Sequence, residues 1–339
     1  MRISWVDNLK GLGIILIVAG HSLFSEGNLF FGYIFCFHVA LFFFLSGYLF
    51  NEEKHNNFKK FLFEKFKRLI IPYISFNLIF IIYERLIEKV PHNLLSVLKG
   101  MFYGTWLKGN KEIFLLNVST WFLLSLFLVS IFYFFINKFI KNKLHRLIFL
   151  FLLSIIIYYE SKIFINIKLP FSIEPSIMAS FFYGIGHIYK EKITNFVEKI
   201  NYKYILYLPG LILLNILFLN GTNFSMNEYG DNYFNFLISS ITGITTWIII
   251  AKIIPQNRIL NFLGINSIII LGMEFLKARI LGFIAKFSYG YIIYERSIES
   301  GLIQLLGTII IMFPIIFIIN KFMPFILGDF KNIKYVKNN

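Results

Sequence analysis

Cysteine is nearly absent from this 339-residue sequence, in which Cys36 stands alone. A single cysteine excludes an intrachain disulfide and any metal site built from several thiolates. Charge is scarce as well: charged residues make up 15% of the chain, with 18 acidic residues against 33 Lys and Arg. Because a soluble domain carries about 25% charged residues, this composition argues against a water-soluble protein.

Apolar side chains take the place of charge. Hydrophobic residues make up 57% of the sequence, and phenylalanine alone occurs 43 times. Ten apolar stretches approach the ~17–25 residues that a membrane-spanning helix needs. We therefore predict an all-α, polytopic membrane bundle of about ten transmembrane helices. The predicted spans are 9–25, 29–50, 69–87, 119–137, 145–161, 171–189, 204–220, 233–251, 262–284 and 301–320.

The Lys and Arg residues predict the orientation of this bundle. With the N-terminus inside the cell, the inside segments hold 22 of the 33 basic residues, and such an excess is typical of cytoplasmic loops. Both termini are therefore expected to be cytoplasmic. The same distribution explains the net charge of +15 without nucleic acid as a partner. We see no internal repeat and no long linker, so we expect one transmembrane domain over 1–328 and a short polar tail over 329–339.

Two apolar helices at the beginning of the chain each carry a histidine. Lys10 and His21 are eleven residues apart, which places them on one helix face, roughly 16 Å apart along the axis. His38 lies about nine residues into the next span, roughly 13 Å deep. Ionisable groups that face hydrocarbon cost at least about 2.5 kcal/mol each, so we expect both histidines to face the bundle interior. An imidazole there can take a proton from a hydroxyl and return it.

These two helices also resemble a known family. The second helix reads FHVALFFFLSGYLF, and together with the Lys10-x10-His21 spacing it resembles the membrane-bound acyltransferase-3 family, whose members O-acylate carbohydrates. The resemblance implies acetyl-CoA as donor, a surface or lipid-linked carbohydrate as acceptor, and a bacterial cytoplasmic membrane as location. It also implies that His21 is the general base, with His38 either as its orienting partner or as a structural histidine.

A basic stretch opens the third span. Lys65, Lys67 and Arg68 precede the sequence Ile-Ile-Pro-Tyr, at a place where the acyltransferase-3 family often carries Arg-x-x-Arg. Cations at a helix start suit polyanions such as the phosphates of coenzyme A. Lys10 is expected at the same membrane face, so we predict that these four residues bind the donor. The alternative for Lys65 and Lys67 is the ordinary positive charge of a cytoplasmic loop.

Three more residues are candidates for the site. Trp121, in a Thr-Trp-Phe-Leu stretch that resembles the family, is of the kind that stacks on a sugar, or equally of the kind that anchors a helix at the interface. Glu274 falls where many family members carry a histidine, and it either orients an imidazole or is a hydrogen-bonded structural carboxyl. Glu174, near the outer end of a span, is a weaker acidic candidate for substrate binding.

Two other functions compete with acyl transfer. A polysaccharide exporter would use the same cavity, aromatic residues and intramembrane charges, although the sequence lacks repeat symmetry. An inactive relative that serves as a structural partner in glycan assembly is the third alternative. The histidines and acidic residues show no metal-ligand spacing, so no metal is expected. Membrane lipids are the remaining predicted partner.

Overall fold

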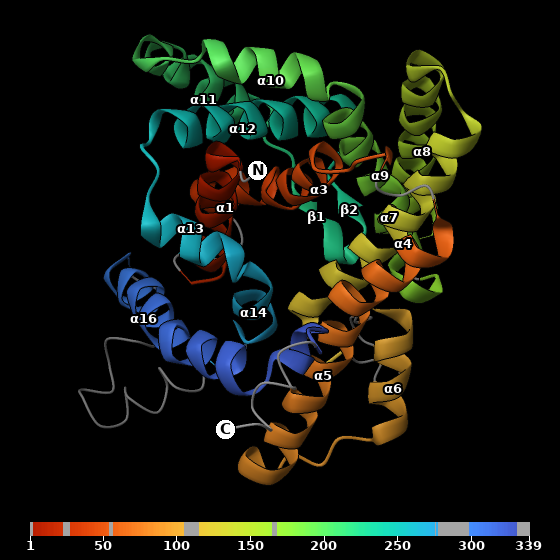
Figure 1. Cartoon of the computed structure of the whole chain (residues 1–339), viewed down its shortest axis with the longest axis vertical. Helices are drawn as coiled ribbons and strands as arrows, with labels where there is room; N and C mark the ends of the chain where they lie inside the picture. The colour runs from red at the N-terminus through yellow and green to blue at the C-terminus, as the bar shows by residue number, and fades with distance from the viewer. Residues whose placement is uncertain are drawn as a thin grey trace.

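The computed structural model describes residues 3–22, 28–53, 57–104, 115–164, 168–274, 276 and 298–330. This part of the chain is almost entirely helical, which confirms the predicted all-α class (Figure 1). The helices are α1 (Ser4–Ser22), α2 (Leu29–Phe35), α3 (His38–Tyr48), α4 (Phe58–Lys65), α5 (Ile71–Tyr83), α6 (Leu94–Tyr103), α7 (Trp121–Phe139), α8 (Lys143–Ile163), α9 (Ile173–Ile188), α10 (Lys190–Lys199), α11 (Leu208–Leu217), α12 (Tyr233–Ile253), α13 (Arg258–Ile265), α14 (Ser267–Gly272) and α16 (Ile298–Phe322). Two short antiparallel strands, β1 (Thr222–Asn223) and β2 (Glu228–Tyr229), form a hairpin.

Several helices of the described residues are long and apolar enough to cross a membrane. Six meet this condition, and α10 with the segment Tyr202–Leu217 forms a bent pair, at 106°, that makes seven if it counts as one span. The protein is therefore a multi-pass membrane protein. The six candidates apart from the bent pair are Leu29–Tyr48, Phe58–Glu88, Val118–Phe139, Lys143–Ile163, Tyr233–Ile253 and Gly301–Phe322.

The predicted total of ten spans is not confirmed, for reasons that differ between helices. The predicted span 171–189 corresponds to α9, which has 16 residues. The predicted span 262–284 breaks at Asn266, whose side chain bonds the Phe262 carbonyl oxygen at 2.8 Å, and most of its second half lies outside the described residues. The total of ten, the side on which the termini lie and the polar tail over 329–339 stay predictions.

The predicted span 29–50 is interrupted at Cys36 and Phe37, and the break sets the position of His38. The imidazole Nδ1 of His38 bonds the carbonyl oxygen of Ile34 at 2.9 Å. The hydroxyl of Ser240 on α12 donates to the carbonyl oxygen of Cys36 at 2.6 Å. Buried carbonyl groups left without partners by a helix break are costly in an apolar interior. The side chains that satisfy them therefore hold His38 at the first position of α3.

A second irregularity lies where α4 continues into α5. The segment η2 (Phe66–Ile70) is π-helical, and Pro72 follows in the first turn of α5. Proline has no N–H to donate and its ring crowds the carbonyl four residues earlier, which here is that of Arg68. The helix widens over η2 instead of keeping its regular bonds. As a result, the predicted cation residues Lys67 and Arg68 lie on an irregular turn.

Helix packing at the centre depends on close approach at glycines. A Cβ atom at Gly47 of α3 would lie 1.9 Å from the carbonyl oxygen of Tyr183 on α9, and one at Gly186 would lie 2.1 Å from the carbonyl oxygen of Phe44. The two helices therefore touch backbone to backbone, as small residues allow in membrane bundles. Figure 1 shows α1 and α3 near the middle of the bundle, with α10, α11 and α12 along one side.

A candidate active site between four segments

A cavity of about 490 Å³ lies between α1, α3, the beginning of α7 and α14. Four of the residues predicted from the sequence line it: His21, His38, Trp121 and Glu274. The two histidines come from neighbouring helices at the beginning of the chain, whereas Trp121 and Glu274 come from segments far from them in sequence. The fold therefore places two imidazoles, a carboxyl group and an indole around one space.

The cavity lining combines apolar and polar side chains. Ile14 and Ile17 of α1 and Leu271 of α14 are among the apolar ones. On α1, His21 follows Ile17 by one turn, and Glu274 follows Leu271 just after α14 ends at Gly272. From Ile14 to His21 the distance along the axis is roughly 10 Å. The cavity thus offers apolar contacts to a small acyl group and polar contacts to hydroxyl groups.

The two imidazoles differ in burial and in their hydrogen bonds. His38 is only 5% exposed, whereas His21 is exposed at the end of α1. The ring of Phe35 contacts both edge to face, with centroids 5.3 Å from His21 and 4.8 Å from His38. Because the Ile34 carbonyl can only accept a hydrogen bond, the neutral His38 ring carries its proton on Nδ1. Its Nε2 then has the lone pair that can accept a proton.

Glu274 is buried, with 5% of its surface exposed, and it is held from the segment that precedes α7. The hydroxyl of Ser119 donates to Glu274 Oε2 at 3.0 Å. Two residues earlier, Asn117 Nδ2 donates to the carbonyl oxygen of Gly272 at 2.8 Å. Ser119 and Asn117 were not among the residues predicted from the sequence. The polar residues directly before Trp121 are the signal that could have indicated them.

Glu174 lies apart from the cavity lining in the described part of the chain. It is 1% exposed at the beginning of α9, where its Oε1 accepts a hydrogen bond from the backbone N–H of Leu169 at 2.7 Å. Its carboxylate also interacts with the ammonium of Lys168. The predicted role in substrate binding therefore has no support from its position.

The predicted donor-binding cations occupy two places. Lys10 is half-buried on α1, one turn before Ile14, and its Cβ packs near Gly264 of α13. The three other cations lie around η2, which packs against α7 and against the turn η8 (Pro324–Leu327). None of these four lines the cavity among the described residues.

Aromatic rings surround the cations near η2. The Lys65 ammonium lies 5.5 Å from the centroid of Phe61, and the Lys67 ammonium lies 4.3 Å from that of Phe63. Arg68 is exposed. The negative face of an aromatic ring attracts such a cation and helps to hold it in place. The arrangement is compatible with a polyanion and equally with lipid phosphates.

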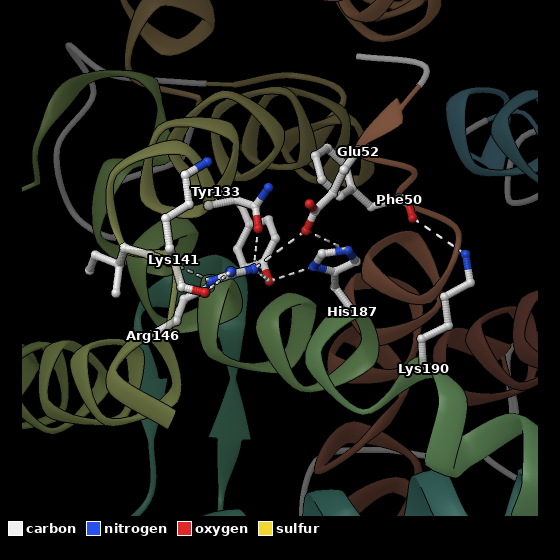
Figure 2. Close-up of polar contacts among 9 residues, drawn as sticks. Phe50, Glu52, Tyr133, Lys141, Arg146, His187 and Lys190 are labelled. Carbon is white, nitrogen blue, oxygen red and sulfur yellow. Dashed lines mark hydrogen bonds and ion pairs between the residues drawn. The ribbon is translucent and has the colours of Figure 1, made fainter. Parts of the chain in front are cut away.

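A second polar cluster lies at the other end of α3, α7 and α9 (Figure 2). Arg146, 4% exposed on α8, donates to the carbonyl oxygens of Ile140 at 3.1 Å and Lys141 at 3.3 Å, and it also bonds Asn137 Oδ1. Arg146 thereby satisfies carbonyl groups at the C-terminal end of α7.

A carboxylate and a histidine complete this cluster. Glu52 lies 3.8 Å from Arg146 and 3.5 Å from Nε2 of His187, whose Nδ1 bonds the Tyr133 hydroxyl at 2.8 Å. Glu52, just after α3, thus connects α8 and α9 (Figure 2). Within the described residues no group of three or more His, Cys, Asp and Glu side chains is placed to hold a metal ion.

A bundle of apolar helices around a cavity with imidazoles and a carboxyl group defines a membrane protein with a candidate acid–base site. The chain belongs to the acyltransferase-3 family: the family's model, described as an acyltransferase domain, matches residues 3–321, nearly the whole chain. The family predicted from the first two helices is thus confirmed, and the protein is a membrane acyltransferase. No curated protein and no solved structure matches the chain.

Proposed function

We propose that this protein transfers an acetyl group from acetyl-CoA to a hydroxyl group of a cell-surface or lipid-linked carbohydrate, in the cytoplasmic membrane of a bacterium. One observation carries the proposal: the cavity gathers His21, His38 and Glu274 beside Trp121. An intramembrane ionisable residue marks a functional site by default. Three in one cavity, in a member of an acyltransferase family, favour proton transfer during acyl transfer.

The proposed reaction is a direct transfer in which His21 acts as general base. Its imidazole takes the proton of the acceptor hydroxyl while the hydroxyl oxygen attacks the thioester carbonyl. The new C–O bond forms as the C–S bond breaks, and the imidazolium returns the proton to the departing thiolate. The carboxylate of Glu274 stabilises the imidazolium, and Trp121 offers a face on which a sugar ring can stack.

The donor is proposed to reach this cavity from the side of Lys10. Lys10 precedes the first apolar lining residue, Ile14, by four residues, roughly 6 Å along α1. The extended pantetheine arm of acetyl-CoA would span the roughly 16 Å from Lys10 to His21. Lys65, Lys67 and Arg68 would bind the phosphates with Lys10. The acetyl group itself would contact apolar lining residues such as Ile14 and Ile17.

A titration of the donor tests the phosphate site. Arg68→Ala removes a charge-assisted hydrogen bond, so we expect the KM for acetyl-CoA to rise about tenfold, with little change in the acceptor KM. Lys60→Ala is the matched control, because Lys60 is an exposed cation on α4 outside the predicted set. If both variants show the same KM for acetyl-CoA, the cations near η2 only set the orientation of the chain in the membrane and do not bind the donor.

The function itself is tested by measuring the O-acetyl content of the host's surface glycan by NMR. A deletion strain is complemented with the wild type or with His21→Ala, and membrane levels of both proteins are compared. We expect acetylation to return with the wild type alone. Full restoration by His21→Ala would show that His21 is not the base. A deletion that alters glycan export and leaves acetylation unchanged would favour an exporter.

A further inference from the structure

The hairpin between α11 and α12 packs most of its residues into the protein, while Glu228 of β2 is exposed. Its connecting turn, η7 (Phe224–Met226), joins β1 to β2. Phe224 and Tyr229 are each 2% exposed. The Phe224 ring contacts Phe182 of α9 and Phe236 of α12, with centroids 6.3 and 5.8 Å away. The hairpin is therefore anchored in the aromatic core of the bundle.

Polar bonds fix the hairpin from three directions. Asn220 Nδ2 donates to the carbonyl oxygens of Tyr229 at 2.8 Å and Asn232 at 2.7 Å, which closes its base. Asn227 Nδ2 donates to Glu160 Oε2 of α8 at 3.3 Å. The ammonium of Lys168, in the connection between α8 and α9, donates to the carbonyl oxygen of Met226 at 2.8 Å. The turn η7 is thus positioned by groups that lie outside the cavity.

Ser225, the middle residue of this turn, lines the cavity. Its hydroxyl donates to Asn223 Oδ1 at 2.7 Å, which orients the oxygen. A hydroxyl group has one donor and two lone pairs, so Ser225 can accept a hydrogen bond from a ligand while it donates to Asn223. His21 and Glu274 line the same cavity.

We propose that this hairpin selects the acceptor, with Ser225 accepting a hydrogen bond from a second hydroxyl group of the carbohydrate, beside the hydroxyl that reacts at His21. This inference rests on the proposed function and adds a determinant for its acceptor. The donor's acetyl group is apolar and suits the side chains of Ile14 and Ile17, which line the cavity. A polyhydroxylated acceptor is the substrate that gains from a fixed serine oxygen.

The same geometry gives Glu174 a role as a positioning residue. Its buried carboxylate binds the Leu169 N–H and attracts the neighbouring Lys168 ammonium, which in turn bonds the turn that carries Ser225. Glu174 therefore acts on the acceptor through Lys168 and η7, without touching it. This accounts for a buried carboxyl group that the cavity lining leaves unexplained.

The test separates acceptor from donor. Purified protein in nanodiscs is assayed with acetyl-CoA and the host's surface glycan after mild alkaline de-O-acetylation, and acetyl-CoA affinity is measured without glycan. Ser225→Ala removes one hydrogen bond between neutral groups of the protein and the glycan. The glycan KM should therefore rise about three- to tenfold, and the Kd for acetyl-CoA should stay unchanged. Ser161→Ala, on α8 with its hydroxyl bonded to the Tyr158 carbonyl oxygen, is the matched control.

The outcomes distinguish this inference from the proposed function. If the wild type transfers acetyl groups and Ser225→Ala keeps the wild-type glycan KM, the inference is wrong and the function stands. If the wild type transfers no acetyl groups to the glycan, the proposed function itself is wrong. Lys168→Met should raise the glycan KM as Ser225→Ala does, and Lys168→Arg should restore it. A loss of folded protein in Lys168→Met without rescue by Lys168→Arg would contradict the positioning role.

Discussion

The hydroxyl of Ser119 donates to Glu274 Oε2 at 3.0 Å and so joins two segments separated by 155 residues. The bond holds the Glu274 carboxyl group in place from the segment before α7. The carboxyl group is therefore fixed in the lining of the cavity that His21 and His38 share. This relationship gives the position a defined part in the site.

Substitutions at this pair separate charge from shape. Glu274→Gln keeps the volume and a hydrogen-bond acceptor but removes the negative charge that stabilises an imidazolium, so kcat should fall roughly 10²-fold with little change in either KM. Ser119→Ala leaves the charge and loosens its position, so its effect should be smaller. Both are measured with acetyl-CoA and glycan in nanodiscs. If both variants kept the kcat of the wild type, Glu274 would be a structural carboxyl group.

His38 allows the roles of the two histidines to be separated. Asparagine at this position can still donate to the Ile34 carbonyl oxygen but has no basic nitrogen, so His38→Asn preserves the helix break and removes the base. If His38 only orients or supports His21, His38→Asn should keep most of the activity, whereas His21→Ala should lower kcat roughly 10²–10⁴-fold. The opposite pattern would make Nε2 of His38 the base.

These histidines could be predicted from the sequence because a titratable group in an apolar helix is expensive and therefore conspicuous. The hairpin that carries Ser225 could not, since two strands of two residues each give no detectable period. The structural role of Arg146 could not be predicted for another reason. A basic residue next to a short loop indicates the cytoplasmic side of a membrane protein, and nothing in the sequence shows that its side chain folds back onto α7.

The number of spans was harder to predict than their composition. Hydropathy detects apolar stretches but does not detect the break at Asn266, where an amide side chain bonds its own helix, nor the bend of 106° between α10 and the segment Tyr202–Leu217. Both also involve partners distant in sequence: at the break, Asn320 Nδ2 of α16 donates to Asn266 Oδ1 at 2.7 Å. The bend, for example, turns the chain before α11, and the buried Asn215 there bonds the Ser239 carbonyl oxygen at 2.6 Å.

Arg146 predicts a loss of stability without a direct effect on chemistry. Arg146→Met leaves the carbonyl oxygens of Ile140 and Lys141 without their charged donor, which should lower the free energy of unfolding by at least about 1.5–3 kcal/mol. Glu52→Gln should cost about 0–1 kcal/mol, because Glu52 is half exposed and its ion pairs are screened. Thermal unfolding in detergent measures both. A low kcat in a fully stable Arg146→Met protein would contradict this structural role.

Lys168 predicts a pH dependence of acceptor binding. Burial lowers the pKa of its ammonium from the usual lysine value, and the carboxylates of Glu174, Glu160 and Glu228 oppose that shift only in part. As the pH rises, Lys168 therefore loses its charge before an exposed lysine does. The attraction to the three carboxylates is then lost and the hold on the Met226 carbonyl weakens. The glycan KM should rise at alkaline pH, while the Kd for acetyl-CoA stays constant.

The sign of the stability change separates this effect from unfolding. Because the pKa of Lys168 is lower in the folded protein than in the unfolded chain, the unfolded state binds more protons, and this group makes the free energy of unfolding rise with pH. A rise of the glycan KM at alkaline pH therefore reflects a change in the position of the hairpin. It does not reflect unfolding caused by the deprotonation of Lys168. In Lys168→Arg the guanidinium stays charged, since its pKa exceeds about 12, so the KM should stay flat over the same range. A wild type and a Lys168→Arg variant with identical pH profiles would show that the charge of Lys168 does not position Ser225.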